Sequence, residues 1–136
     1  MVAAVCSWHE RHADAAREID RRLEHGERLC AAAHALVEAY AVLTRLPPPH
    51  RLSAADAWAL IESNFVNGAA VVTLPVDRYV DVLRRAARSG VAGGRAYDAV
   101  IGECAREAKA DVMLTFNRRH FDPPPAGVVV VEPGSG

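Results

Sequence analysis

The apolar residues of the chain follow two patterns, one with helical spacing and one in short continuous runs. Ala16, Ile19 and Leu23 recur at helical spacing among charged residues, which predicts an amphipathic helix that stops before Gly26. This first helix covers residues 8–25, and the same reasoning predicts further helices over 34–46, 53–65, 76–89 and 95–108. Short, mainly apolar runs predict strands over 28–33, 69–74, 112–116 and 128–131, with a loop over 117–127.

This order of elements indicates the class of the fold. The predicted strands are continuously apolar and helices lie between them, which is typical of a parallel sheet covered on both faces. The 136 residues fit one domain over 1–136, and we find no internal repeat or linker. In such sheets ligands bind beyond the carboxyl ends of the strands, so polar residues at those ends are of most interest.

Composition excludes several classes of protein and indicates where the protein is located. With 51% hydrophobic residues the chain is not of the disordered class, and no apolar run approaches the ~20 residues of a membrane helix. The N-terminus lacks the basic start of a signal peptide. The three cysteines, Cys6, Cys30 and Cys104, are odd in number and far apart, which argues against a disulfide framework. We therefore expect a cytoplasmic protein that makes no use of a membrane.

The net charge of −1 hides an uneven distribution of charged residues. Residues 84–120 carry eight basic and four acidic side chains, so a basic face is expected there. All but one of the 16 basic residues of the chain are arginines, a residue type that suits phosphate binding. A nucleic-acid substrate is therefore compatible with the sequence.

Three polar residues stand out in apolar surroundings. Glu38 has no cation three or four residues away in its predicted helix, Asp98 lies in the first turn of another, and Asn117 follows the predicted strand 112–116. Each has an ordinary interpretation, as a solvated helix edge, a residue at the positive end of a helix dipole, or a turn residue. Taken together, they offer hard oxygen ligands that suit Mg²⁺ or Mn²⁺ beside three phosphate-compatible donors, Arg118, Arg119 and His120.

Three segments, in this order, resemble the PIN-domain ribonucleases, and most of all the VapC toxins of bacterial VapBC toxin–antitoxin modules: residues 35–47, 93–101 and 114–121. The resemblance implies a three-layer α/β/α sandwich around a central, mainly parallel sheet. It also implies one or two Mg²⁺ or Mn²⁺ ions that activate water for attack on an RNA phosphodiester.

The resemblance also implies roles for individual residues. Glu38 and Asp98 match carboxylates that hold the metal, and Asn117 stands where many family members have another aspartate. We therefore expect these three residues to be catalytic and to ligate the metal. The residues expected to contact the substrate are Thr115, at the family's strand-end hydroxyl position, and Arg118 and Arg119.

The start of the chain departs from the family pattern. Family members open with an apolar strand that ends in an aspartate, a principal metal ligand, whereas residues 1–6 resemble the segment after it. We expect this first strand to be absent, because the true start lies upstream or because the chain is truncated and metal-impaired. Residues 1–5 then either take the place of the strand or leave the fold weakened.

These observations give three functional hypotheses. The first is a Mg²⁺- or Mn²⁺-dependent endoribonuclease toxin of a type II toxin–antitoxin system, which would form a homodimer and bind a VapB-like antitoxin. The second is a catalytically impaired PIN-fold module that binds antitoxin or RNA without cleaving RNA. The third is an unrelated α/β domain in which the acidic residues have no common role.

Overall fold

A computed structural model describes residues 1–135 of the chain. The chain divides into two compact units, residues 1–71 and a second unit that starts at Val72, and each is described by itself. None of the helices within the described residues is both long enough and apolar enough to cross a membrane. The elements are α1 (Val2–Val5), α2 (His12–Glu24), β1 (Cys30–Ala32), α3 (Ala33–Arg45), α4 (Ala54–Ile61), the π-helical turn η1 (Glu62–Val66), β2 (Ala70–Val72), α5 (Val76–Arg88), α6 (Arg95–Glu107), β3 (Val112–Leu114), the 3-10 turn η2 (Arg118–Phe121) and β4 (Val129–Val131).

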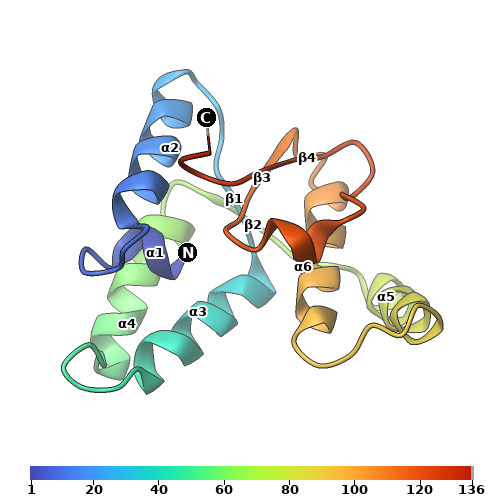
Figure 1. Ribbon diagram of the computed structural model, residues 1–136, viewed down its shortest axis with the longest axis horizontal. Helices are drawn as coiled ribbons and strands as arrows, with labels where there is room; N and C mark the ends of the chain where they lie inside the picture. Colours follow the sequence, from blue (N-terminus) through green and yellow to red (C-terminus); the bar gives the residue numbers. More distant parts are fainter. Residues whose placement is uncertain (136) are drawn as a thin grey trace. The chain divides into compact units, whose positions relative to one another are not determined.

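The core of the first unit lies between α3 and α4. Leu43 and Ile61 are its largest fully buried side chains, and Cys6 and Ala57 pack with them. Helix α4 starts where the sequence indicates, because the Ser53 hydroxyl accepts a hydrogen bond from the Asp56 amide at 3.1 Å. Strands β1 and β2 pair beside these helices, so the first unit contains a two-stranded sheet (Figure 1).

The second unit combines two helices with a parallel pair of strands. Helices α5 and α6 lie side by side, and Figure 1 shows them together. Strands β3 and β4 are parallel, with Val112 opposite Val129 and Leu114 opposite Val131. The Thr115 amide donates to the Val131 carbonyl at 3.0 Å, which extends the ladder one residue beyond β3. The end of this ladder is the position where a parallel sheet offers a binding site.

The predicted α/β class with parallel strands is confirmed, and each predicted helix is present. The strands are three residues long, shorter than predicted, and Val71 and Val129 are 45% and 61% exposed. Within the described residues each strand pairs with one neighbour, and the exposure of these two valines shows that the strands are not covered on both faces. Two predictions about the whole chain stay predictions: one central sheet in a three-layer sandwich, and a single domain over 1–136. Both would require the two units to join.

Residues 1–5 do not take the place of a strand, so this one of the two expected outcomes is wrong, and the weakening of the fold stays a prediction. Val2–Val5 is a single helical turn in which the Cys6 amide donates to the Val2 carbonyl at 3.1 Å. The turn packs against α2 and α3, and Ala3 is buried there. Tertiary packing has therefore outweighed the strand preference of the two valines.

Candidate active site

Asp98 occupies the first turn of α6, where the positive end of the helix dipole favours a carboxylate. Its side chain is 21% exposed, and the Oδ2 atom lies 2.8 Å from Nδ1 of His120. Because an ionised carboxylate can only accept hydrogen bonds, the His120 ring donates from Nδ1. The two residues are 22 positions apart in the chain, so this contact reflects tertiary structure rather than local helix geometry.

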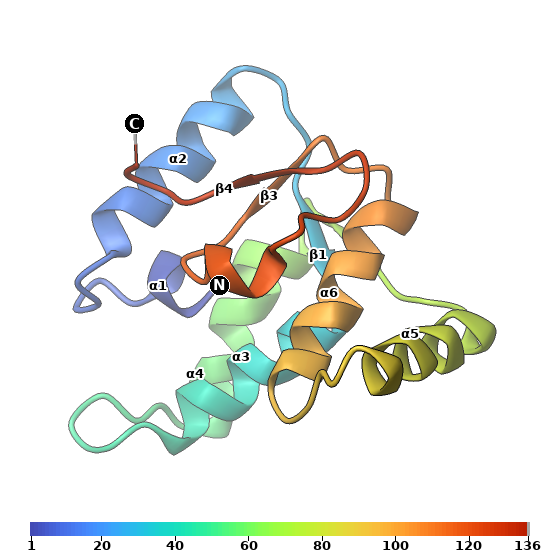
Figure 2. The ribbon, with the colours of Figure 1, turned by 45° about the vertical axis from the view of Figure 1, so that its right-hand side comes forward.

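The packing of Phe121 explains why His120 reaches Asp98. Phe121 ends the turn η2 and is buried against α6 at Gly102. A Cβ atom at Gly102 would lie 3.2 Å from Cγ of Pro125, so the absent side chain permits the close approach of Pro125, and it would make an ordinary contact of 3.7 Å with the Phe121 ring. Asp98 and Gly102 are one turn apart on the same face of α6. The turn η2 therefore lies along α6 (Figure 2), and a hydrogen bond places His120 beside the Asp98 carboxylate.

The residues that follow β3 form a tight connection into the turn η2. The Asn117 amide donates to the Thr115 hydroxyl at 3.0 Å, and the His120 amide donates to the Asn117 carbonyl at 2.9 Å. The Asn117 side chain makes no capping hydrogen bond, which disfavours the interpretation of this residue as a helix cap. Asn117 is exposed beyond the end of the strand, as predicted.

A pocket of about 380 Å³ lies at this end of the β3–β4 ladder. Asn117 and the three basic side chains after it are exposed here, and one acidic residue, Glu132, joins them. The lining thus combines an amide, two guanidinium groups and an imidazole, which are donors for a phosphate oxygen. The lining residues are Phe116, Asn117, Arg118, Arg119, His120 and Glu132.

Glu38 belongs to the first unit, where it lies half-buried near the middle of α3. Its meeting with Asp98 and Asn117, which lie in the second unit, stays a prediction.

The donor chemistry can be tested against the ion that the resemblance implies. Among residues 1–135 no three His, Cys, Asp or Glu side chains gather as a metal-binding group. Zinc in proteins requires three or four such side chains, whereas Mg²⁺ uses one or two carboxylates and completes its shell with water and substrate phosphate. The Asp98 carboxylate and the Asn117 amide, both in the second unit, offer oxygen donors of the kind that the second pattern uses.

Sequence reasoning identified the strand-end residues but missed the pairing of His120 with Asp98. His120 was expected as a phosphate donor only, because the sequence does not show that η2 lies against α6. Glu132 was not expected in the pocket at all. The one available signal was Gly102, a glycine in the interior of a predicted helix, which marks a place where another segment can approach closely.

The chain belongs to a known class of protein. The PIN domain family model matches residues 1–124, so the chain belongs to the PIN-domain family. Among proteins of that family, the chain resembles the VapC group. It is 34% identical over 113 residues to Ribonuclease VapC40 of Mycobacterium tuberculosis, in strains CDC 1551 and H37Rv, which covers 83% of this chain and 78% of the relative. It is also 38% identical over 79 residues to Ribonuclease VapC27 of strain H37Rv, which covers 58% and 56% of the two chains.

Proposed function

We propose that this protein is a Mg²⁺- or Mn²⁺-dependent endoribonuclease and acts as the toxin of a type II toxin–antitoxin pair in the cytoplasm. The observation that carries the proposal is the Asp98–His120 pair next to a pocket of phosphate donors at the end of the β3–β4 ladder. The names of the VapC relatives support RNA as the substrate.

Each residue of the site has a role in this proposal. Asp98, Glu38 and Asn117 would hold the ion, which supplies positive charge to the phosphodiester and lowers the pKa of attacking water. The hydrogen bond from His120 fixes the Asp98 carboxylate, so its oxygens keep one orientation.

The residues around Asp98 would hold the RNA. Arg118 and Arg119 would bind the substrate phosphate through charge-assisted hydrogen bonds at the pocket. The Thr115 hydroxyl accepts from the Asn117 amide, and this contact would hold the chain in place at the strand end.

The test is cleavage of RNA by the Asp98→Asn variant with and without Mn²⁺. We expect a loss of about 100-fold or more, because the amide cannot supply the negative charge that a divalent ion requires. Asp81→Asn is the matched control, since Asp81 is a half-exposed acid of the same unit that pairs with Arg84. Equal cleavage by both variants would contradict the proposed site.

A second pair of variants tests whether the hydrogen bond from His120 positions the Asp98 carboxylate. Asn at this position can place an amide nitrogen close to where Nδ1 lies, whereas Ala removes the donor. We expect His120→Asn to keep more activity and Mn²⁺ affinity than His120→Ala. If both variants bind Mn²⁺ as tightly as the wild type, the hydrogen bond to Asp98 does not position the carboxylate.

The alternative is a PIN-fold module that binds antitoxin or RNA without cleavage. Asn117 favours it, because the family resemblance places this uncharged residue where many members have an aspartate. Calorimetric titration with Mn²⁺, together with an RNA-binding assay, distinguishes the two functions. RNA binding without Mn²⁺ binding or cleavage would favour the alternative.

We also propose that the protein forms a homodimer and binds a VapB-like antitoxin. Light scattering on the purified chain tests the first point. Co-purification with the product of an adjacent antitoxin-like gene tests the second.

A further inference from the structure

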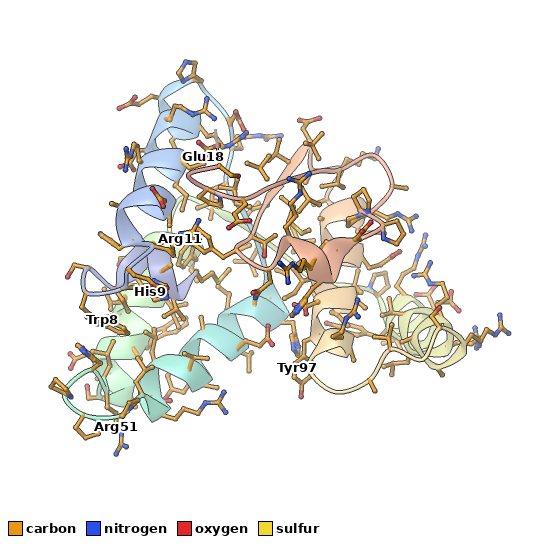
Figure 3. All side chains as sticks on the ribbon, in the orientation of Figure 1. Trp8, His9, Arg11, Glu18, Arg51 and Tyr97 are labelled. Carbon is orange, nitrogen blue, oxygen red and sulfur yellow. The ribbon has the colours of Figure 1, made fainter. Side chains whose placement is uncertain are left out.

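Two aromatic rings stack on the surface of the first unit, and neither belongs to the candidate active site. Trp8 lies in the loop between α1 and α2, and His50 in the loop between α3 and α4. Their ring centroids are 4.1 Å apart and their planes differ by 25°. Trp8 nevertheless keeps 44% of its surface exposed, unlike the buried residues of the nearby core. Figure 3 shows Trp8 and His9 on one of these loops and Arg51 on the other.

Backbone hydrogen bonds hold both loops in place. In the first loop the His9 amide donates to the Cys6 carbonyl at 2.9 Å, and Cys6 is part of the buried core. In the second loop the His50 amide donates to the Pro47 carbonyl at 3.1 Å. These bonds constrain the backbone next to Trp8 and at His50, which lowers the entropy cost of binding a flat molecule on the stacked rings.

A cation adjacent in the sequence to the stack is available for an anionic ligand. Arg51 follows His50 directly, is exposed, and donates from Nε to the Leu46 carbonyl at 2.8 Å. Arg51 forms no ion pair with any acidic residue in the described part of the chain. Its guanidinium can thus donate to a phosphate. An aromatic face beside a cation is the combination that binds single-stranded nucleic acid.

We propose that the Trp8–His50 stack is a second RNA-binding site, which takes one nucleobase on the indole and a neighbouring phosphate on Arg51. This inference rests on the proposed function in taking RNA as the ligand and Glu38 as part of the catalytic site. Glu38, a proposed catalytic residue, lies about 10 Å along the α3 axis from the last residue of that helix, after which the His50 loop begins. The stack would therefore hold a nucleotide outside the bond that is cleaved, and would contribute to the choice of RNA.

The experiment uses the two tryptophans of the chain as probes. Trp58→Phe leaves Trp8 as the single indole, and Trp8→Phe leaves Trp58, which is 46% exposed on α4 and serves as the matched control. Each variant is titrated with a short single-stranded RNA in EDTA, so that neither metal nor cleavage is involved. We expect saturable quenching of fluorescence in Trp58→Phe and none in Trp8→Phe.

An abasic oligomer of the same length separates stacking from charge. We expect it to bind more weakly and to leave Trp8 fluorescence unchanged, because it carries phosphates but no bases. Trp8→Leu should weaken RNA binding by about 5- to 100-fold, whereas Trp8→Phe should retain most of the affinity. Arg51→Gln should reduce the affinity for both oligomers.

Several results would overturn the inference. Equal quenching by the abasic oligomer would mean that charge alone attracts RNA, and equal quenching in both tryptophan variants would mean that the ligand has no preference for Trp8. A change in oligomeric state in Trp8→Leu, with RNA affinity intact, would mean that the stack is a protein–protein contact. If Trp8→Leu does not fold, the two phenylalanine variants still decide. Because these titrations contain no metal, they can fail while Asp98-dependent cleavage succeeds, and the reverse.

Discussion

Glu103 is the single buried charged residue in the described part of the chain, and three arginines surround it. Its side chain on α6 is 7% exposed. Arg85 and Arg106 donate to Oε2 at 3.0 and 3.2 Å, and Arg78 lies 3.6 Å from Oε1. Because Arg78 and Arg85 belong to α5, this carboxylate links the two helices of the second unit. Glu103→Gln removes the negative charge with little change in shape.

The expected loss of stability depends on how buried Glu103 is and how exposed the arginines that pair with it are. Removing one partner of a fully buried ion pair costs about 3–5 kcal/mol, because it leaves an uncompensated charge. Here the arginine side chains are 38% to 53% exposed, so water still solvates the guanidinium groups. We therefore expect Glu103→Gln to lower the free energy of unfolding by about 2 kcal/mol, less than the fully buried case.

Urea unfolding followed by circular dichroism measures this difference. Asp81→Asn is the control, since it breaks a pair with Arg84 in which both side chains are about half exposed, and it should cost at most about 0.5 kcal/mol. High salt should remove the effect of Asp81→Asn and leave most of the effect of Glu103→Gln. The reasoning would be refuted if the two variants lost the same small amount of stability.

Two further predictions concern ionisable groups. Burial raises the pKa of the Cys104 thiol, with a smaller contribution from the neighbouring glutamates, whereas Cys30 is exposed. At mildly alkaline pH a thiol reagent should therefore modify Cys30 rapidly and Cys104 only on unfolding, and rapid modification of Cys104 in the folded protein would contradict this. The hydrogen bond from Arg21, followed by that from Arg22, lowers the pKa of Glu18. The stabilisation is thus present above the unfolded pKa of 4.5 and is lost as the pH falls through the folded pKa, so Glu18→Gln should show less acid destabilisation than the wild type in thermal melts.

The helices could be predicted because each carries its pattern within a single segment. The predicted helix 76–89 agrees with α5 to one residue, since Gly90, which has a φ of 69°, ends it. The lengths of the strands were overestimated, since β2 covers only three residues of the predicted strand 69–74. An apolar run shows where a strand can form, but its length depends on how far the partner strand extends, and the sequence pattern does not contain this.

The candidate site shows the same division between local and tertiary information. Asn117 beyond the end of β3 and Asp98 in the first turn of α6 follow from local patterns and the order of motifs. The contact between Asp98 and His120 does not, because it depends on how η2 packs against α6. This packing is decided by Phe121 and Pro125 at Gly102, and no periodicity connects these three positions.

Two consecutive residues of α6 connect the site to the stability of the second unit. Gly102 accepts the Phe121 ring and lies one turn after Asp98, while Glu103, the next residue, faces the arginines of α5. The helix thus has its carboxylate site on the face that contacts η2 and its ion cluster on the face that contacts α5. A helix fixed on both faces cannot rotate about its axis without breaking one set of contacts. The buried ion cluster therefore restricts the direction in which Asp98 points.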